Sequence, residues 1–197
     1  MATISAETVK ALRDLSGAGV MECKRALEET SGDVEKAAAL LRERGQAAAA
    51  KRADRDAKDG LISSYIHPGS RIGVLIEVNC ETDFVARTDE FQKLVRSLAV
   101  QVAGLRPVYT TVDAIPADVL EAKKAELLAS DAVANKPEAV KAQIVEGQLK
   151  KWFSEVVLTE QPFRDEDRTV GALITEAIAK TGENIRVRRF VRFELGE

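Results

Sequence analysis

Alternating apolar and polar residues from Arg71 to Cys80 predict a β-strand that has one face on a core. The stretch from Leu61 to Ile66 also has strand character, and the connecting residues His67 to Ser70 include adjacent proline and glycine, which mark a tight turn. The two stretches therefore predict an antiparallel hairpin. The core-facing positions expected on the longer strand are Ile72, Val74, Ile76, Val78 and Cys80.

A third strand is predicted from Ile185 to Leu195, where residues again separate into an apolar and a polar set. We expect the apolar set to face the core and the polar set to form a wet, basic face. Arg189 and Phe190 interrupt the alternation, which predicts a β-bulge or contacts on both faces. The apolar set is Ile185, Val187, Val191, Phe193 and Leu195, and the polar set is Arg186, Arg188, Arg192 and Glu194.

Helical spacing of apolar residues dominates the remainder of the chain. Residues 1–50 predict three short helices, the first capped by Ser5 or Thr3 and the third by Asp33. Another helix follows the hairpin, with apolar positions from Phe91 to Leu105. Three more helices are expected later. Residues 116–130 have a weak apolar stripe, which is typical of a surface helix or of one that contacts another chain.

The helix that begins near Pro137 has a stronger stripe, which we expect to be buried. A last helix is capped by Thr169 and ends at Gly182.

The predicted fold class is α+β: a small three-helix N-terminal module, residues 1–50, followed by a core of antiparallel sheet plus helices, residues 61–197. The mixed-sign run between them, residues 51–60, is predicted to be a charged linker. The stripe after Pro137 consists of Val145, Leu149, Trp152 and Val156.

Composition narrows the classes of function. A net charge of −3 argues against nucleic-acid binding through bulk electrostatics. No apolar run is long enough to span a bilayer, and the N-terminus has neither the layout of a signal peptide nor the composition of a transit peptide. Cys23 and Cys80 both lie in apolar patterns, so we expect two buried, reduced thiols, as in a cytoplasmic protein.

The corner between the long strand and the helix after it is the first candidate site. Thr82 or Thr88 is positioned to cap the helix, so Asp83 and Phe84 lie where side chains reach a partner. Spacing alone leaves an alternative open. Phe84 precedes Phe91 by two turns and would join it on a buried stripe if the helix began early.

The loop between the first two helices is the second candidate site. Val20 and Met21 follow Gly17 and Gly19, and they either pack inside the helical bundle or present an apolar contact to a partner, as ubiquitin-associated-type bundles do.

Two long motifs resemble the elongation factor Ts family. The run EVNCETDFVAR, residues 77–87, is similar to the family's central signature, and LRDLSGAGVMECKRAL, residues 12–27, is similar to its N-terminal signature. The runs YIHPGSRIGVL, IVEGQLKKWF and EQPF give weaker support. Ser16 stands where the family usually has threonine, and Gln148 replaces a common arginine.

The resemblance implies a guanine-nucleotide exchange factor for elongation factor Tu, a translation GTPase. Asp83 and Phe84 would be a wedge that inserts into the GTPase domain, dislodges Mg²⁺ and loosens GDP, while Thr82 and Val85 hold the wedge in shape. Leu12, Val20 and Met21 would dock the N-terminal module on the same domain.

The resemblance also implies a cytoplasmic homodimer, because this short chain carries one core where long members carry two. We expect its interface at the C-terminal strand or at the middle helices. We expect no cofactor or metal bound by the chain itself, and no direct contact with nucleic acid.

Three other functions are weaker interpretations of the same residues. Residues 1–50 alone would suit a ubiquitin-binding module, and the C-terminal arginines would suit an RNA-binding module. An enzyme is disfavoured because the sequence has a single histidine and no nucleophile, metal or phosphate-loop pattern.

Overall fold

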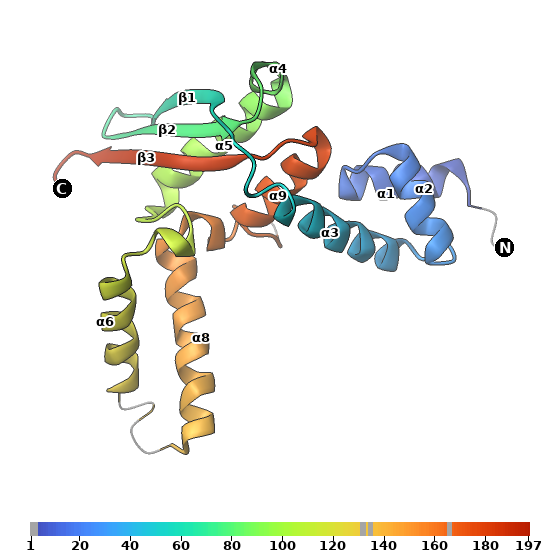
Figure 1. The fold of residues 1–197 in the computed structure, drawn as a ribbon. Coiled ribbons are helices and arrows are strands. Elements are labelled where there is room, and N and C mark those ends of the chain that lie inside the picture. The colour runs from blue at the N-terminus through green and yellow to red at the C-terminus, as the bar shows by residue number, and fades with distance from the viewer. Residues whose placement is uncertain (1–3, 131–132, 134–135, 165–166) are drawn as a thin grey trace. The chain divides into compact units, whose positions relative to one another are not determined.

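The computed structural model describes residues 4–130, 133, 136–164 and 167–197 (Figure 1). It confirms the α+β class: helices accompany a three-stranded antiparallel sheet in the order β1-β2-β3. Ser5 caps the first helix by accepting from the Thr8 N–H, while the alternative cap, Thr3, lies outside the described residues. The elements are α1 (Ala6–Ser16), α2 (Val20–Glu29), α3 (Val34–Ala50), β1 (Asp59–Ile66), β2 (Ile72–Cys80), α4 (Asp83–Ala86), α5 (Asp89–Leu105), α6 (Ala117–Leu128), α8 (Glu138–Val156), α9 (Val170–Thr181) and β3 (Arg186–Glu194), with short 3₁₀ helices at Val112–Ala114 and Leu158–Glu160.

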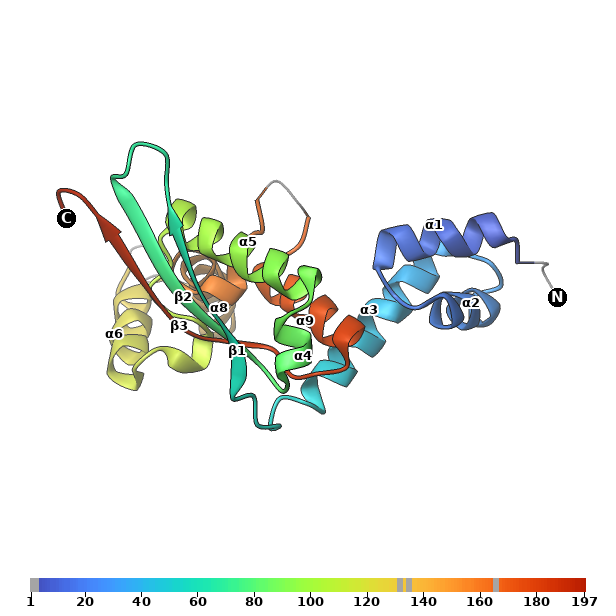
Figure 2. The same ribbon diagram turned by 90° about the horizontal axis from the view of Figure 1, so that it is seen from above.

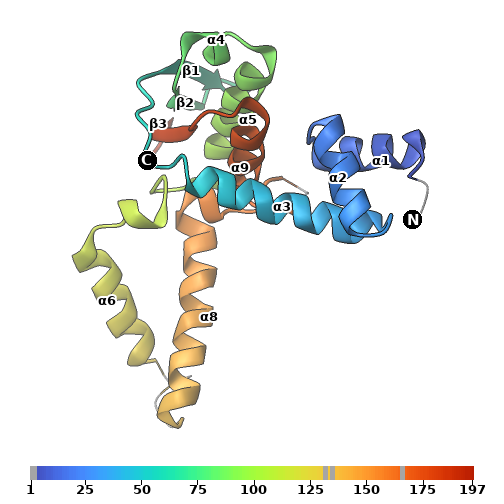
Figure 3. The ribbon, with the colours of Figure 1, turned by 45° about the vertical axis from the view of Figure 1, so that its right-hand side comes forward.

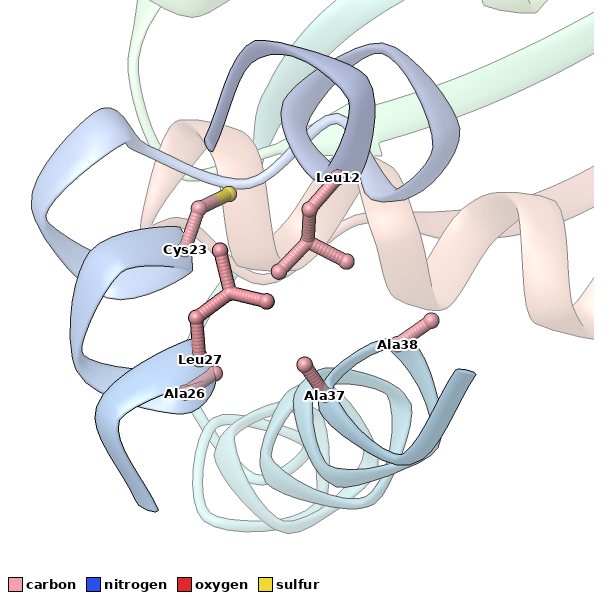
Figure 4. Close-up of a cluster of buried hydrophobic side chains, with 6 residues drawn as sticks. All are labelled: Leu12, Cys23, Ala26, Leu27, Ala37 and Ala38. Atoms are coloured by element: carbon pink, nitrogen blue, oxygen red, sulfur yellow. The ribbon is translucent and has the colours of Figure 1, made fainter. Parts of the chain in front are cut away.

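The three N-terminal helices enclose a small core of their own (Figure 4). Leucine and cysteine side chains from α1 and α2 meet alanines of α3, and the small alanines allow the helices to approach closely. Asp33 caps α3 as expected by accepting from the Lys36 N–H. The buried members of this core are Leu12, Cys23, Ala26, Leu27, Ala37 and Ala38.

The hairpin of β1 and β2 turns at His67–Ser70, where the His67 N–H donates to the Ile72 carbonyl. One face of β2 is buried at Val74, Ile76 and Val78, as the alternation predicted. Figures 1 and 2 show α5 along one side of the sheet. The buried positions of this helix include Phe91, Leu98 and Val102.

The face assignment for the C-terminal strand was wrong in its second half. Val187 is buried as expected, but Phe193 is 69% exposed, and Val191 and Leu195 are exposed with it. Arg192 instead lies on the helix side, where its Nε donates to the Ala103 carbonyl of α5. The alternation of faces shifts at two consecutive residues: Arg188 and Arg189 are both exposed, and both pair with Glu77 of β2. The side chains that follow therefore lie on the face opposite to the one predicted.

The expected buried stripe of α8 was also wrong. None of the helix's residues is fully buried, and the predicted members Val145, Leu149, Trp152 and Val156 are half-buried. The reason is that α8 packs alongside α6 as a helical hairpin, which covers only part of its surface (Figure 3). α6 has no fully buried residue either, in keeping with its weak stripe.

The chain divides into two compact units, one formed by Met1–Leu61, Val78–Leu94 and Leu173–Arg186, and the other by Ile62–Glu77, Val95–Ala172 and Val187–Glu197. The division does not follow the boundaries predicted at residues 50 and 61, which stay predictions. Within the described residues, no helix has the length and apolarity that a membrane crossing requires.

Candidate protein-docking site

Two threonine caps build the corner that follows β2. The strand ends at Cys80, and the Thr82 hydroxyl accepts from the Val85 N–H at 3.5 Å to start α4. The Thr88 hydroxyl then accepts from the Phe91 N–H at 3.2 Å to start α5. Both of the expected caps are therefore used, one for each helix, and the separate short turn α4 carries Asp83 and Phe84.

Phe84 points away from the core. Its side chain is 77% exposed, whereas Phe91, the neighbour with which it was aligned by spacing, is 2% exposed. The alternative that both share one buried stripe is therefore wrong. Large aromatic side chains are mostly buried in folded proteins. One that is held in solvent on a capped turn is therefore typical of a residue that contacts a partner.

Arg87 restrains both wedge residues from the next turn. Its guanidinium forms an ion pair with the Asp83 carboxylate and lies over the Phe84 ring, 5.7 Å from the centroid. Side chains four residues apart meet on one side of a helix, so the sequence contained this signal in the spacing of Asp83 and Arg87.

The environment of Cys80 makes its thiol a poor nucleophile. Burial, aided by the negative charge of Glu183, raises the pKa of the Cys80 thiol from 9.0 to about 11. The thiol donates to the Thr82 carbonyl at 3.2 Å, and Cys80 and Cys23 are both free and buried, as predicted. Cys80 is therefore a packing residue and not a nucleophile.

The end of α1 and the start of α2, on either side of their connecting loop, expose apolar residues that we call the docking patch: Leu15, Val20 and Met21. Met21 is 62% exposed, so the alternative that it packs inside the bundle is wrong, and Val20 is exposed as well. Gly17 ends α1 with φ +65°, a conformation that favours glycine. Leu15 was missed because helical spacing placed it on the same stripe as Leu12.

Leu12 requires a correction. The resemblance had made it a docking residue, but it is 0% exposed and lies at the centre of the N-terminal core (Figure 4). It therefore does not touch a partner in this conformation and supports the docking patch from beneath. The Ser16 hydroxyl steadies the same loop by donating to the Leu12 carbonyl at 2.7 Å, a bond that a threonine hydroxyl also makes.

Comparison with known proteins decides the family. A family model described as elongation factor TS matches residues 2–197. Elongation factor Ts of Heliobacterium modesticaldum is 55% identical over 196 residues, covering 98% of this chain and 91% of that protein. The elongation factor Ts of Moorella thermoacetica is 56% identical over 196 residues, with 98% and 96% coverage. That of Carboxydothermus hydrogenoformans is 55% identical over 196 residues, with 98% and 90% coverage. The chain belongs to the elongation factor Ts family.

Membership of the elongation factor Ts family makes this chain a translation elongation factor. The described residues contain no group of three or more His, Cys, Asp or Glu side chains that could hold a metal ion. In this family member the C-terminal arginines are largely engaged within the protein. Arg188 and Arg189 pair with Glu77, and Arg192 pairs with Glu194 at 2.5 Å.

Proposed function

We propose that this chain is a guanine-nucleotide exchange factor that binds elongation factor Tu·GDP, dislodges Mg²⁺ and promotes release of GDP so that GTP rebinds. The observation that carries this proposal is the exposed Phe84 on a capped corner between β2 and α4. The wedge consists of Asp83 and Phe84, and Thr82 and Val85 hold its shape.

The mechanism requires a rigid surface and no covalent chemistry. In GTPases, phosphate and Mg²⁺ stabilise each other, so displacing one loosens the other. A factor that binds the nucleotide-free GTPase more tightly than the GDP-bound form lowers the affinity for GDP, and GDP lowers the affinity for the factor by the same ratio. The chain is therefore not an enzyme in its own right, and it uses no cofactor or metal of its own.

The docking patch supplies the second contact with the GTPase. Leu15, Val20 and Met21 are exposed apolar side chains on a module with its own buried core, so the patch is presented on a firm support. A second contact raises the affinity of the chain for the GTPase without any change in the wedge. When the docking patch is bound, it holds the wedge near its site at a high effective concentration.

A homodimer is the second part of the proposal, and the outer face of the sheet supports it as the interface. This face, the side away from α5, exposes apolar side chains on all three strands of the second unit. Such a face in water favours association with a second copy. The exposed apolar residues of the sheet face are Ile62, Ile66, Leu75, Val191, Phe193 and Leu195.

The location and remaining partners follow from the same role. An exchange factor for a translation GTPase acts in the cytoplasm. We propose no direct contact with nucleic acid, because the net charge is −3 and the C-terminal arginines are engaged by carboxylates.

The test is the rate at which a fluorescent GDP leaves elongation factor Tu. We expect strong acceleration by the wild-type chain and a loss of at least roughly tenfold with Phe84→Ala, since a transition-state contact is removed. Acceleration that survives this substitution would move the wedge to Asp83 or to the docking patch. Folded protein that gives no acceleration at all would overturn the proposed function.

A further inference from the structure

The connection between α9 and β3 is hydrogen-bonded to the corner after β2, which carries the wedge residues Asp83 and Phe84. The Glu183 carboxylate accepts from two consecutive backbone N–H groups, those of Glu81 and Thr82, each at 3.0 Å. Its other oxygen accepts the Thr82 hydroxyl at 2.6 Å. A charged acceptor makes stronger hydrogen bonds than a neutral one, so these three bonds form a firm attachment.

Glu183 also determines which way the Thr82 hydroxyl points. A hydroxyl has one proton to donate, and an ionised carboxylate only accepts, so the proton of Thr82 is directed to Glu183. The lone pairs of the same oxygen then face the Val85 N–H, which is the capping bond of α4. The orientation of the cap is thus imposed by a residue outside the corner.

The short length of α4 makes this support necessary. Residues Asp83–Ala86 form a single turn, and an isolated turn is unstable because nucleation of a helix costs more than one hydrogen bond returns. Phe84 contributes little to holding it, since its ring lies in solvent. The conformation of the wedge therefore depends on the Thr82 cap and on the contacts of Arg87.

A reciprocal set of bonds anchors the connection itself. The Glu81 carboxylate accepts from the Asn184 N–H at 2.6 Å and pairs with Arg55 at 3.5 Å. The buried side-chain amide of Asn184 donates to the carbonyls of Ala53 and Arg55, at 3.1 and 2.8 Å. These bonds anchor the backbone at Asn184, next to Glu183, so the Glu183 carboxylate starts from a fixed point beside Thr82.

We propose that Glu183 is a positioning residue for nucleotide exchange: by fixing the Thr82 cap, it presents Phe84 in one orientation before the GTPase is met. This inference rests on the proposed exchange function. Preorganisation of this kind removes an ordering cost from the step that it serves. Loss of Glu183 should therefore reduce the maximal exchange rate more than it reduces docking.

The kinetic test compares Glu183→Ala and Glu183→Gln with the wild type in fluorescent-GDP release from elongation factor Tu. We expect Glu183→Ala to lower the maximal rate roughly tenfold or more, because small misplacements of a reacting surface are costly. We expect the half-saturating concentration to change less than about twofold, because the docking patch is untouched. Glu183→Gln should give an intermediate loss, since its amide keeps one acceptor oxygen and its nitrogen cannot accept.

A matched control and a double substitution separate positioning from charge or folding. Glu121→Gln removes the same charge from an exposed position on α6 and should leave the rate unchanged. Thr82→Val combined with Glu183→Ala should be no slower than the slower single variant, because both remove the same cap. Additive losses would contradict the inference.

Amide hydrogen exchange in the free protein gives a readout that does not depend on the GTPase. The N–H groups of Thr82 and Val85 should exchange faster in Glu183→Ala, with thermal unfolding used to confirm that the variant is folded. If Glu183→Ala does not fold, Glu183→Gln decides both measurements. Full acceleration and unchanged amide exchange in the folded variant would overturn the inference and leave the proposed function intact. If the wild type gave no acceleration, the proposed function would fail and the role of Glu183 in exchange would fail with it, whatever the amides showed.

Discussion

Two phenylalanines seven residues apart have opposite environments in this chain. Phe91 is enclosed by the core, while Phe84 is held in solvent by a turn that is capped at Thr82 and restrained by Arg87. Burial of a large side chain contributes to stability, whereas exposure contributes almost nothing. The position of each ring therefore predicts which property a substitution will change.

Phe84→Ala should leave the free energy of unfolding within about 0.5 kcal/mol of the wild type, because little apolar surface is lost from the core. Phe91→Ala should lower it by about 3–5 kcal/mol, because a cavity replaces a buried ring. Denaturant unfolding of both variants checks this pair. A large destabilisation by Phe84→Ala would mean that the ring packs inside the protein in solution.

Cys80 gives a chemical test of the same corner. With its pKa raised to about 11, the thiolate fraction at pH 8 is about a hundredfold below that of a thiol at the ordinary value of 9.0. Alkylation of native protein by iodoacetamide should therefore be very slow, and it should rise as the pH approaches the raised pKa. Glu183→Ala should speed it, since removing a nearby negative charge lowers the pKa. Equal rates for native and unfolded protein would contradict the buried thiol.

At the scale of elements, the residues on either side of the turn between α1 and α2 form an exposed layer that can bind a partner and a buried layer that stabilises the module. Leu15 and Met21 lie on the surface and Leu12 beneath them, all on the same two helices. The two layers together account for the apolar residues at the end of α1 and the start of α2. One layer closes the core of the module, and the other is left for a partner.

Substitutions in the two layers should differ in what they change. Met21→Ala should weaken binding to elongation factor Tu, measured by calorimetry, with little effect on thermal stability. Leu12→Ala should lower the free energy of unfolding by about 2–5 kcal/mol, because it empties a fully buried site. Unchanged affinity with Met21→Ala would remove the docking patch from the proposal.

Sequence patterns predicted correctly the elements that have one regularly buried face, such as β2. The alternation of β2 gave its buried face correctly: Val74, Ile76 and Val78 are buried, and α5 runs along one side of the sheet. The pattern failed in β3, where two arginines beside Glu77 shift the register, and a shift of one residue moves every later side chain to the other face.

The pattern also failed for α8, because an apolar stripe does not reveal how much of it a single neighbouring helix covers. At the candidate site, the motif identified Phe84 but not Glu183. The three hydrogen bonds of Glu183 to the corner join residues about a hundred positions apart, and residue spacing carries no signal at that range.

At the scale of the whole molecule, there are two candidate interfaces for the proposed homodimer: the sheet face and the α6–α8 hairpin. Both expose apolar side chains: Phe193 and Val191 on the sheet, and Leu128 and Val140 on the hairpin. The sheet face is the stronger candidate, because its exposed apolar residues come from strands that are hydrogen-bonded side by side in the order β1-β2-β3. Stable dimers bury about 1,600 Å² in total, which a sheet face supplies more readily than the edge of a two-helix hairpin.

Phe193→Glu should therefore convert a dimer into a monomer, while Leu128→Glu should leave the dimer intact. The physical reason is that a carboxylate placed in an apolar interface must lose its hydration without gaining a partner. Analytical ultracentrifugation at micromolar concentration distinguishes the two results. Dissociation by Leu128→Glu alone would move the interface to the helices. A monomeric wild type would remove the homodimer from the proposal and leave the exchange function to a single copy, with its one wedge at Phe84 and its one docking patch.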